Sequence, residues 1–357
     1  MSPYFSRNSY HTIQVVKPVP HPKKVVSDIL RFVSHSTATT MLLALVGAAN
    51  HGVMMVPMVS AALLGECVPM ESKNGGVIYI SKMAMGSPLQ YFYVVPDTGS
   101  FSLVAPSTLC QSSECSAHAK FNPASSSTYF SDGKRSGLAY GSGKIQVMSA
   151  KDNVQLGQHF SAGVDAELIT SAAYLNNYAQ APYDGIMGLG KRQDTTKFGP
   201  TAIDQKPLLT ALNVKKFTMC LGSQHVSGVD KGGRLMLDED LEPEISRGFV
   251  SLATKGETMW AAGLTSAQTI SANATKGKQL IDTNVSVVGV PDSGTSLLTF
   301  PPWLFSSLMD EIEAGCPFQD CIDKLSEQST CSGEIFDKLP NLGLTFGGVD
   351  ISLAPKT

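Results

Sequence analysis

The chain has little charge for its length. Only 16% of its 357 residues are Asp, Glu, Lys or Arg, against about a quarter in ordinary soluble domains. Basic residues interleaved with aromatic ones are missing, which argues against nucleic-acid binding. No Cys-x₂-Cys pair occurs, and His118, His159 and His225 stand apart, without metal-ligand spacing. We therefore expect no metal and no cofactor, and we expect these histidines to be solvated.

Helical patterns are scarce as well. The chain contains 32 Gly and 20 Pro residues, which separate many short apolar runs. Only a few short stretches, such as 206–212 and 302–312, are predicted to be helices. With 43% hydrophobic residues, the chain can bury more than one core. The composition therefore predicts an all-β fold with two lobes.

Two short triplets carry most of the chemical information. Asp97 begins Asp-Thr-Gly and Asp292 begins Asp-Ser-Gly, and each triplet ends an apolar run. This pattern predicts a strand, a tight turn and a second strand, with glycine allowing the turn to close. A single copy is common by chance. Two copies in matching contexts indicate duplicated lobes whose turns meet at a pseudo-twofold axis.

Two carboxylates that meet in this way have a defined chemistry. Like charges about 3 Å apart cannot both ionise cheaply, so the pair shares one proton. One carboxylate can then activate a water while the other protonates a carbonyl oxygen. This chemistry requires no metal. A glycosidase with two carboxylates is a poorer interpretation, because glycosidases do not need paired Asp-[Thr/Ser]-Gly turns.

From about residue 76 to about residue 355 the chain resembles the pepsin-like aspartic proteases. Segments 95–107 and 290–296 are similar to the two active-site segments of that family. Segment 121–128 is similar to the loop that follows its first small disulfide, and 140–143 to the tip of its flap hairpin. The resemblance implies a bilobal fold with the active site between the lobes.

The resemblance also implies roles for individual residues. Asp97 and Asp292 would be catalytic, and the flap would contain Tyr140 and Gly141. The supporting residues would be Thr98, Gly99, Ser100, Ser293, Gly294 and Thr295. Thr98 and Ser293 would bond across the floor of the site, and Ser100 and Thr295 would orient the outer carboxylate oxygens. Without the family, Tyr140 is a hairpin aromatic that packs on its own lobe.

Segment 184–190 resembles the strand that passes behind the first catalytic loop. Three positions depart from the family pattern. Val104 stands where a tryptophan usually contacts the flap tyrosine, and Pro96 and Pro291 precede the aspartates, each removing one backbone donor. After Asp292 we find no apolar-apolar-Gly segment. In the family, several tens of further residues supply that segment and the strands that close the second lobe and the interlobe sheet, so we expect an incomplete second lobe.

The domains are expected at 1–67 (leader), 68–225 (first lobe) and 226–357 (second lobe). The leader contains 24 residues, 41–64, without Asp, Glu, Lys or Arg. A signal peptide is the favoured interpretation, followed by a signal anchor; a transit peptide or a buried segment stays open. The family's basic pro-segment does not fit between residue 64 and the strand-like 76–80, unless residues 1–40 take that part.

Cysteine usage favours an exported protein. The resemblance implies a disulfide between Cys110 and Cys115, and a second-lobe disulfide between Cys331 and either Cys316, the preferred partner, or Cys321. Cys67 is unassigned, and Cys220 is predicted to be a buried strand thiol. Asn-x-[Ser/Thr] sequons at 273 and 284 would be glycosylated in the secretory pathway.

The sequence therefore predicts an aspartic-type endopeptidase that favours acid and acts on an extended polypeptide. We expect a monomer without nucleic-acid partners. We expect the protein in the secretory pathway. It would be secreted, vacuolar/lysosomal, or anchored in a membrane through 41–64. The alternative is a catalytically weak or inactive relative that binds peptides in the same cleft.

Overall fold

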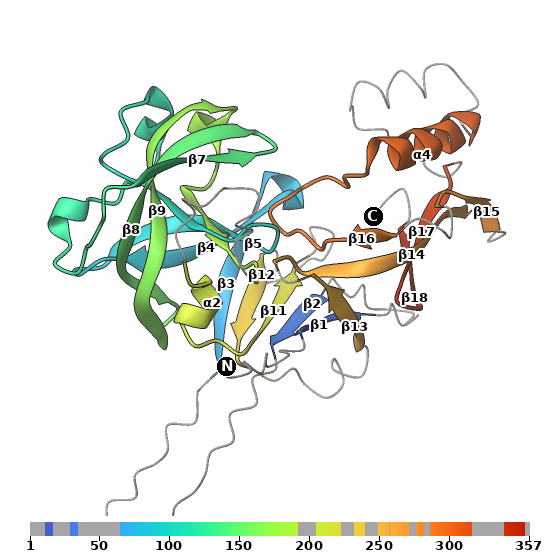
Figure 1. Cartoon of the computed structure of the whole chain (residues 1–357), viewed down its shortest axis with the longest axis horizontal. Helices are drawn as coiled ribbons and strands as arrows, with labels where there is room; N and C mark the ends of the chain where they lie inside the picture. The colour runs from blue at the N-terminus through green and yellow to red at the C-terminus, as the bar shows by residue number, and fades with distance from the viewer. Residues whose placement is uncertain are drawn as a thin grey trace, which may run out of the picture.

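The structure is a computed structural model of the whole chain (Figure 1). It describes residues 11–16, 29–34, 65–191, 205–222, 232–239, 249–256, 258–270, 276–281, 286–315 and 339–353. These residues are mostly in strands, which confirms the all-β class. Helices are short apart from α4 (Pro302–Gly315), and α4 and α2 (Leu208–Ala211) lie at the two places where helices were predicted.

The strands are numbered in the order in which they occur along the chain. Their bounds are β1 His11–Val16, β2 Ile29–Ser34, β3 Glu66–Lys73, β4 Ile78–Met85, β5 Gln90–Asp97, β6 Leu103–Pro106, β7 Arg135–Tyr140, β8 Gly143–Leu156, β9 Phe160–Leu175, β10 Gly185–Gly188, β11 Lys216–Leu221, β12 Gly233–Leu237, β13 Phe249–Lys255, β14 Ala261–Ile270, β15 Lys276–Gln279, β16 Val287–Gly289, β17 Asn341–Phe346 and β18 Val349–Leu353. Single 3₁₀ turns are η1 Asn74–Gly76, η2 Ser113–Ala117, η3 Pro123–Ser125 and η4 Tyr178–Gln180.

The first lobe is built from the long hairpin β8–β9 and the strands beside it. β8 alternates buried and exposed positions, as expected of a strand with one face on a core. It pairs with β9 along most of its length, and also with β7 and with β4. Phe92, Phe121 and Leu168 are among the buried residues at the centre of this lobe.

The second lobe is smaller in the described part of the chain. β14 pairs with β15, β16 and β17, and β17 continues into β18. Helix α4 covers this sheet, with Leu304 buried against Leu264, Ile281 and Leu344. Figure 1 shows this lobe on the opposite side of the molecule from the β7–β8–β9 strands.

A twisted sheet joins the two lobes. Its strand order is β3-β12-β11-β2-β1-β13, antiparallel throughout. β1 and β2 belong to the predicted leader, where no strand was predicted. The predicted lobe boundary after residue 225 falls between the paired strands β11 and β12, and the domain limits stay a prediction.

The apolar segment 41–64 lies outside the described residues. Among the residues that are described, no helix is long and apolar enough to cross a membrane.

Candidate functional site

Each predicted catalytic aspartate lies at the start of a tight turn. Asp97 ends β5, and Asp292 follows β16 by three residues. The N–H of Gly99 donates to Asp97 Oδ1 at 2.8 Å. In the second turn, the N–H of Gly294 donates to Asp292 Oδ1 at 2.9 Å. The two triplets therefore form the same local structure, 195 residues apart.

The two carboxylates lie against each other's turns. A Cβ atom on Gly99 would overlap the carboxylate of Asp292, and a Cβ atom on Gly294 would overlap the carboxylate of Asp97. Only glycine fits at either position, because the opposite side chain occupies the space. This reciprocal contact brings the two carboxylates together, as the duplicated triplets predict.

The middle residues of the triplets bond across the floor of the site. The N–H of Thr98 donates to Ser293 Oγ, and the N–H of Ser293 donates to Thr98 Oγ1, both at 3.0 Å. The hydroxyl of Thr98 donates to the carbonyl of Pro291 at 2.6 Å, and that of Ser293 to the carbonyl of Pro96 at 2.7 Å. Both prolines lack an N–H, yet each supplies an acceptor to the opposite loop.

The outer hydroxyl residues differ between the loops. Thr295 Oγ1 donates to Asp292 Oδ2 at 2.7 Å, which is the orientation that the sequence predicts. The hydroxyl of Ser100 is buried without a well-formed hydrogen bond, although it lies close enough to Asp97 to act on its pKa. Ser296 forms a further link, donating to the carbonyl of Val77 at 2.9 Å.

The environment of Asp97 favours its protonated form. Burial raises the pKa of Asp97 to about 6, and the Asp292 carboxylate adds to the effect. Ser100 and the N–H of Gly99 act in the opposite direction but do not outweigh burial. Asp97 is 7% exposed. Two carboxyl groups in contact share one proton, and the raised pKa of Asp97 favours Asp97 as its holder.

The strand that was predicted behind the first loop is present. β10 pairs in parallel with β5 and antiparallel with β6. The N–H of Leu189 donates to the carbonyl of Asp97 at 2.7 Å, and that of Gly190 to the carbonyl of Ser100 at 2.8 Å. Met187 and Leu189 are fully buried beneath the loop. This strand fixes the backbone on which Asp97 stands.

A cleft with a volume of about 700 Å³ opens above the two carboxylates. It is lined by both lobes, and its walls include Tyr140, Gly141, Val104 and Tyr183. Tyr140 ends β7 at the tip of the β7–β8 hairpin and packs against the buried cluster that contains Val104. Burial, with contributions from nearby acidic groups that include Asp97, raises the pKa of Tyr140. Its hydroxyl therefore keeps its proton across the ordinary pH range.

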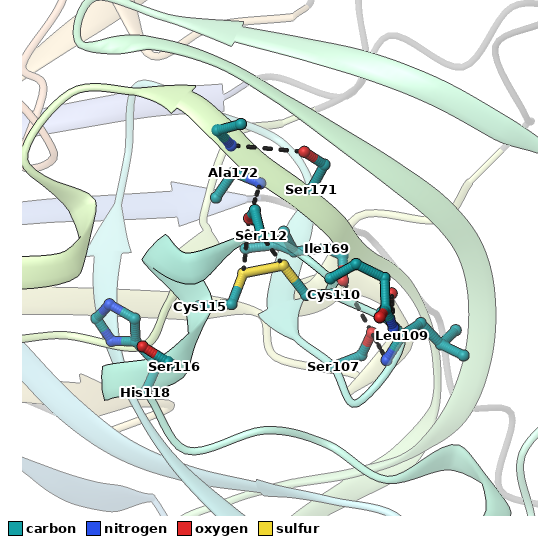
Figure 2. The surroundings of a disulfide bond; sticks show 12 residues. Ser107, Leu109, Cys110, Ser112, Cys115, Ser116, His118, Ile169, Ser171 and Ala172 are labelled. Atoms are coloured by element: carbon teal, nitrogen blue, oxygen red, sulfur yellow. Dashed lines mark hydrogen bonds between the residues drawn. A yellow bond between two sulfur atoms is a disulfide. The ribbon is translucent and has the colours of Figure 1, made fainter.

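The predicted disulfide between Cys110 and Cys115 is formed (Figure 2). Figure 2 shows Ser112 over the two sulfur atoms, and its hydroxyl accepts a 2.9 Å bond from the N–H of Ala172 in β9. Both cysteines are buried in the cluster that carries Tyr140. The disulfide thus closes the loop around η2, and the bond from Ala172 to Ser112 ties this loop to β9.

The prediction for His118 is wrong, because this side chain is buried rather than solvated. Its ring stacks on Tyr178 with centroids 4.1 Å apart, and Nε2 lies 2.8 Å from the Tyr178 carbonyl. Nδ1 lies 3.5 Å from Asp184, just before β10. Burial acts to raise the pKa of Asp184, but hydrogen bonds from His118 and from two backbone N–H groups outweigh it and lower the pKa.

Sequence reasoning missed two groups near the cleft. Tyr183 lines it, and burial together with Asp97 raises the pKa of this tyrosine. Glu167 in β9 is 4% exposed and accepts a 2.9 Å bond from Gln205. Burial raises the pKa of Glu167 to about 7. No local motif marks either residue, because their partners lie far away in the sequence.

Other predictions fall outside the described residues. These are Cys316, Cys321, Cys331, His225 and the sequons at 273 and 284. Cys220 is half-buried on β11, and burial raises the pKa of its thiol to about 11. Among the described residues, no group of three or more His, Cys, Asp and Glu side chains could hold a metal ion.

Two β lobes that each contribute an Asp-Thr/Ser-Gly turn to one site define the class of aspartic proteases. Comparison with known proteins identifies the family, because residues 78–357 match the model described as eukaryotic aspartyl protease. The chain belongs to this family, which confirms the resemblance and the assignment to the aspartic-type endopeptidases.

Individual relatives agree with this assignment. Pepsin A of Rhinolophus ferrumequinum is 28% identical over 278 residues, covering 78% of this chain and 67% of that protein. Gastricsin of Rattus norvegicus is 29% identical over 289 residues, with the same coverage. Gastricsin of Suncus murinus is 30% identical over 278 residues. The chain thus spans about two thirds of the length of these relatives.

Proposed function

We propose that this protein hydrolyses peptide bonds with a water held between Asp97 and Asp292, and that it favours acidic pH. The observation that supports the proposal most is the reciprocal contact, in which each carboxylate lies against the glycine of the opposite turn. Thr98 and Ser293 lock this arrangement with matched hydrogen bonds.

The position of the shared proton follows from the environment of Asp97. Asp292 in its ionised form takes a proton from the water, whose oxygen attacks the carbonyl carbon of the substrate. Asp97, with its raised pKa, donates its proton to the carbonyl oxygen, giving a neutral tetrahedral intermediate. In the collapse of this intermediate, Asp292 gives the proton it took from the water to the leaving nitrogen, and Asp97 takes back a proton from a hydroxyl of the intermediate. The C–N bond breaks, a carboxylic acid and an amine are released, and the shared proton is restored to Asp97. Because the mechanism needs Asp97 protonated, activity should fall as the pH rises through about 6.

The cleft suits an extended polypeptide. It runs across both lobes beneath the β7–β8 hairpin, so a substrate would lie under Tyr140 and over the two aspartates. Val104 and Ile186 contribute apolar surface to the same walls. We expect apolar side chains to be preferred beside the scissile bond, with Tyr140 and Gly141 closing over it as a flap.

The buried Cys110–Cys115 disulfide supports a location in the secretory pathway. The protein would be secreted, vacuolar or lysosomal after removal of 41–64 as a signal peptide, or membrane-anchored if that segment is kept. Glycosylation at Asn273 and Asn284 and a monomeric state belong to the same proposal.

The test is cleavage of an unfolded protein substrate by the purified full-length chain across a pH series. We expect cleavage near pH 4 that declines through about pH 6, and none from the Asp292→Asn variant at any pH. Peptide binding at acidic pH without cleavage would instead support the alternative of an inactive peptide-binding relative.

The flap assignment has its own test. Replacing Tyr140 with Ala should lower kcat/KM by roughly ten- to a thousandfold, or about 1.4–4 kcal/mol of transition-state stabilisation. Thermal stability should change little. The control, Tyr140→Phe, keeps the ring and shows how much of the effect belongs to the hydroxyl. A large loss of stability with an unchanged kcat/KM would mean that Tyr140 only packs on its own lobe.

A further inference from the structure

The cleft above the two carboxylates extends into the first lobe, among strands β7, β8 and β9 (Figure 1). Three of the side chains that line it there are almost inaccessible to solvent: Val104 is 1% exposed, Ile169 2% and Ile145 3%. A side chain that borders a cavity and is nonetheless so deeply buried lies at the closed end of that cavity. We call this closed end the Val104 pocket. Its other walls are Leu138, Tyr140, Leu175, Tyr178, Tyr183 and Ile186.

The direction of the Val104 side chain follows from the strand that carries it. β6 pairs with β9 on one side and with β10 on the other, so the backbone at Val104 is held by both neighbours. Successive strand residues face opposite sides of a sheet. Leu103 and Ala105 belong to the larger core cluster, whereas Val104 belongs to the cluster against which Tyr140 packs. The residue at position 104 therefore sets how far the enzyme itself fills the pocket.

Valine is a small side chain for this position, because it ends in two methyl groups on Cβ. The cleft as a whole has a volume of about 700 Å³, within the range of about 300–1,000 Å³ that is usual for ligand sites. Apolar side chains that border unfilled space lose van der Waals contacts on that side. An apolar group of a ligand that enters the pocket supplies these contacts.

One wall of the pocket is a fixed aromatic surface. Tyr178 stacks on His118, with ring centroids 4.1 Å apart, and its hydroxyl donates to the carbonyl of Asp184 at 2.5 Å. The centroid of the Tyr183 ring lies 6.5 Å from that of Tyr178, with the ring planes at 51°. Aromatic rings attract one another in offset or edge-on contacts at such distances. The pocket therefore favours an aromatic group over an aliphatic one.

The pocket opens beside the reacting groups. The Asp97 carboxylate adds to burial in raising the pKa of both Tyr140 and Tyr183, so both side chains lie within electrostatic reach of it. Each hydroxyl keeps its proton and can also accept a hydrogen bond, for example from the N–H of an indole ring. A side chain in the pocket thus belongs to a substrate residue close to the bond that is cut.

We propose that the Val104 pocket binds a large aromatic side chain of the substrate, tryptophan above all, at a residue next to the scissile bond, and that Val104 determines this specificity. The inference rests on the proposed function and names the substrate class that the same cleft selects. Because Tyr140 forms part of the pocket wall, the bound ring also contacts the flap and favours its closure over the substrate.

The first test compares peptides that differ at one residue. Trp, Leu or Ala stands directly before the scissile bond in one series and directly after it in a second. In one of the two series we expect the full-length chain to cleave the Trp peptide with a kcat/KM at least about tenfold above that of the Ala peptide, with Leu between them, because an apolar pocket discriminates by side-chain size. Cleavage with a ratio near one in both series, or with Leu above Trp, would overturn the pocket and leave the proposed function standing.

The second test fills the pocket from the enzyme side. Val104→Trp should lower the ratio of kcat/KM for the Trp and Ala peptides at least about tenfold, and its Tm should fall by no more than a few degrees because the ring enters open space. The control is Val288→Trp, the same substitution at a residue that is 50% exposed and does not line the cleft. It should keep the parent's ratio. An unchanged ratio in Val104→Trp, or the large loss of Tm that overpacking a filled core causes, would contradict the proposal.

Binding separates the pocket from catalysis. Peptides whose scissile amide is replaced by an uncleavable methyleneamine carry Trp or Ala at either position, and calorimetry with the full-length chain measures their Kd. We expect Trp to improve the Kd at least about tenfold at one position, and Val104→Trp to remove this gain. If the parent cleaves no peptide while the gain is present, the proposed function fails and the pocket stands. Equal Kd values for Trp and Ala at both positions would overturn the pocket, whatever the activity.

Discussion

The two aspartate loops have the same local structure but very different support. Asp97 is 7% exposed, and the strand β10 passes directly behind its loop. Asp292 is half-buried, and in the described part of the chain no strand pairs with its loop. Six residues after each aspartate stands a leucine: Leu103 is 2% exposed and Leu298 is 64% exposed.

The difference separates local from long-range determinants. The Asp-Thr/Ser-Gly triplet is sufficient for the turn, because Gly99 and Gly294 donate to their aspartates in the same way. The first loop is also more deeply buried, which raises the pKa of Asp97, and among the described residues it alone has a strand paired behind it. The second loop instead depends on contacts with the first lobe, through Thr98 and through Val77.

The largest expected effect concerns the two equivalent leucines. Leu103→Ala should lower the free energy of unfolding by about 2–5 kcal/mol, because it opens a cavity between β6 and β10. The matched variant Leu298→Ala removes an exposed side chain and should change it by less than about 0.5 kcal/mol. Chemical denaturation of the full-length chain measures both values. Equal losses would mean that Leu298 is covered in solution and that the loops are supported alike.

The next effect concerns the charge of Asp97. Its folded pKa of about 6 exceeds the ordinary value of 3.8 for an aspartate, so ionisation of this side chain destabilises the folded state at neutral pH. The destabilisation is complete above about pH 6, shrinks as the pH falls and is absent below about pH 4. Asp97→Asn should therefore raise the free energy of unfolding at pH 7 by up to about 3 kcal/mol, and by much less at pH 4.

Asp292→Asn is the matched control for this prediction. It should give a smaller gain at pH 7, because Asp292 is more exposed and the substitution weakens the bond from Thr295. Thermal melts at the two pH values distinguish the variants. A gain for Asp97→Asn that is the same at both pH values would contradict the raised pKa.

The smallest effect tests the hydrogen bonds across the floor of the site, which are matched between the two loops. Ser293→Ala and Thr98→Val each remove one hydroxyl that accepts one cross-loop bond and donates another. Each should cost about 1–3 kcal/mol of stability, and the two costs should be similar. The exchanges Ser293→Thr and Thr98→Ser keep a hydroxyl and should cost less. A clearly unequal pair would mean that one loop relies on the other more strongly.

The site could largely be predicted from the sequence, because its signals are short and occur in a fixed order. The paired triplets, the strand at 184–190, the hairpin that ends at Tyr140 and the Cys110–Cys115 pair are all segments of a few residues. The triplets carry their own turn signal in the glycine that follows the aspartate. The strand, the hairpin and the cysteine pair were predicted from the family resemblance of their segments.

Features that depend on distant partners could not be predicted. His118 was expected in solvent, but it is buried by Tyr178 and Asp184, which lie about sixty residues later in the chain. The strands His11–Val16 and Ile29–Ser34 have no strong local signal, and their pairing with β13 and β11 is a long-range register match. Such pairings depend on which edges the rest of the fold leaves open.

The most direct test of the account is whether Asp97 and Asp292 act as one unit despite their different surroundings. The measurement is kcat/KM at acidic pH for Asp97→Asn, Asp292→Asn and the double variant of the full-length chain. We predict that each single variant loses nearly as much as the double variant, since groups that act as a unit are far from additive. Retention of about a tenth of the parent's activity by either single variant would contradict the shared-proton dyad.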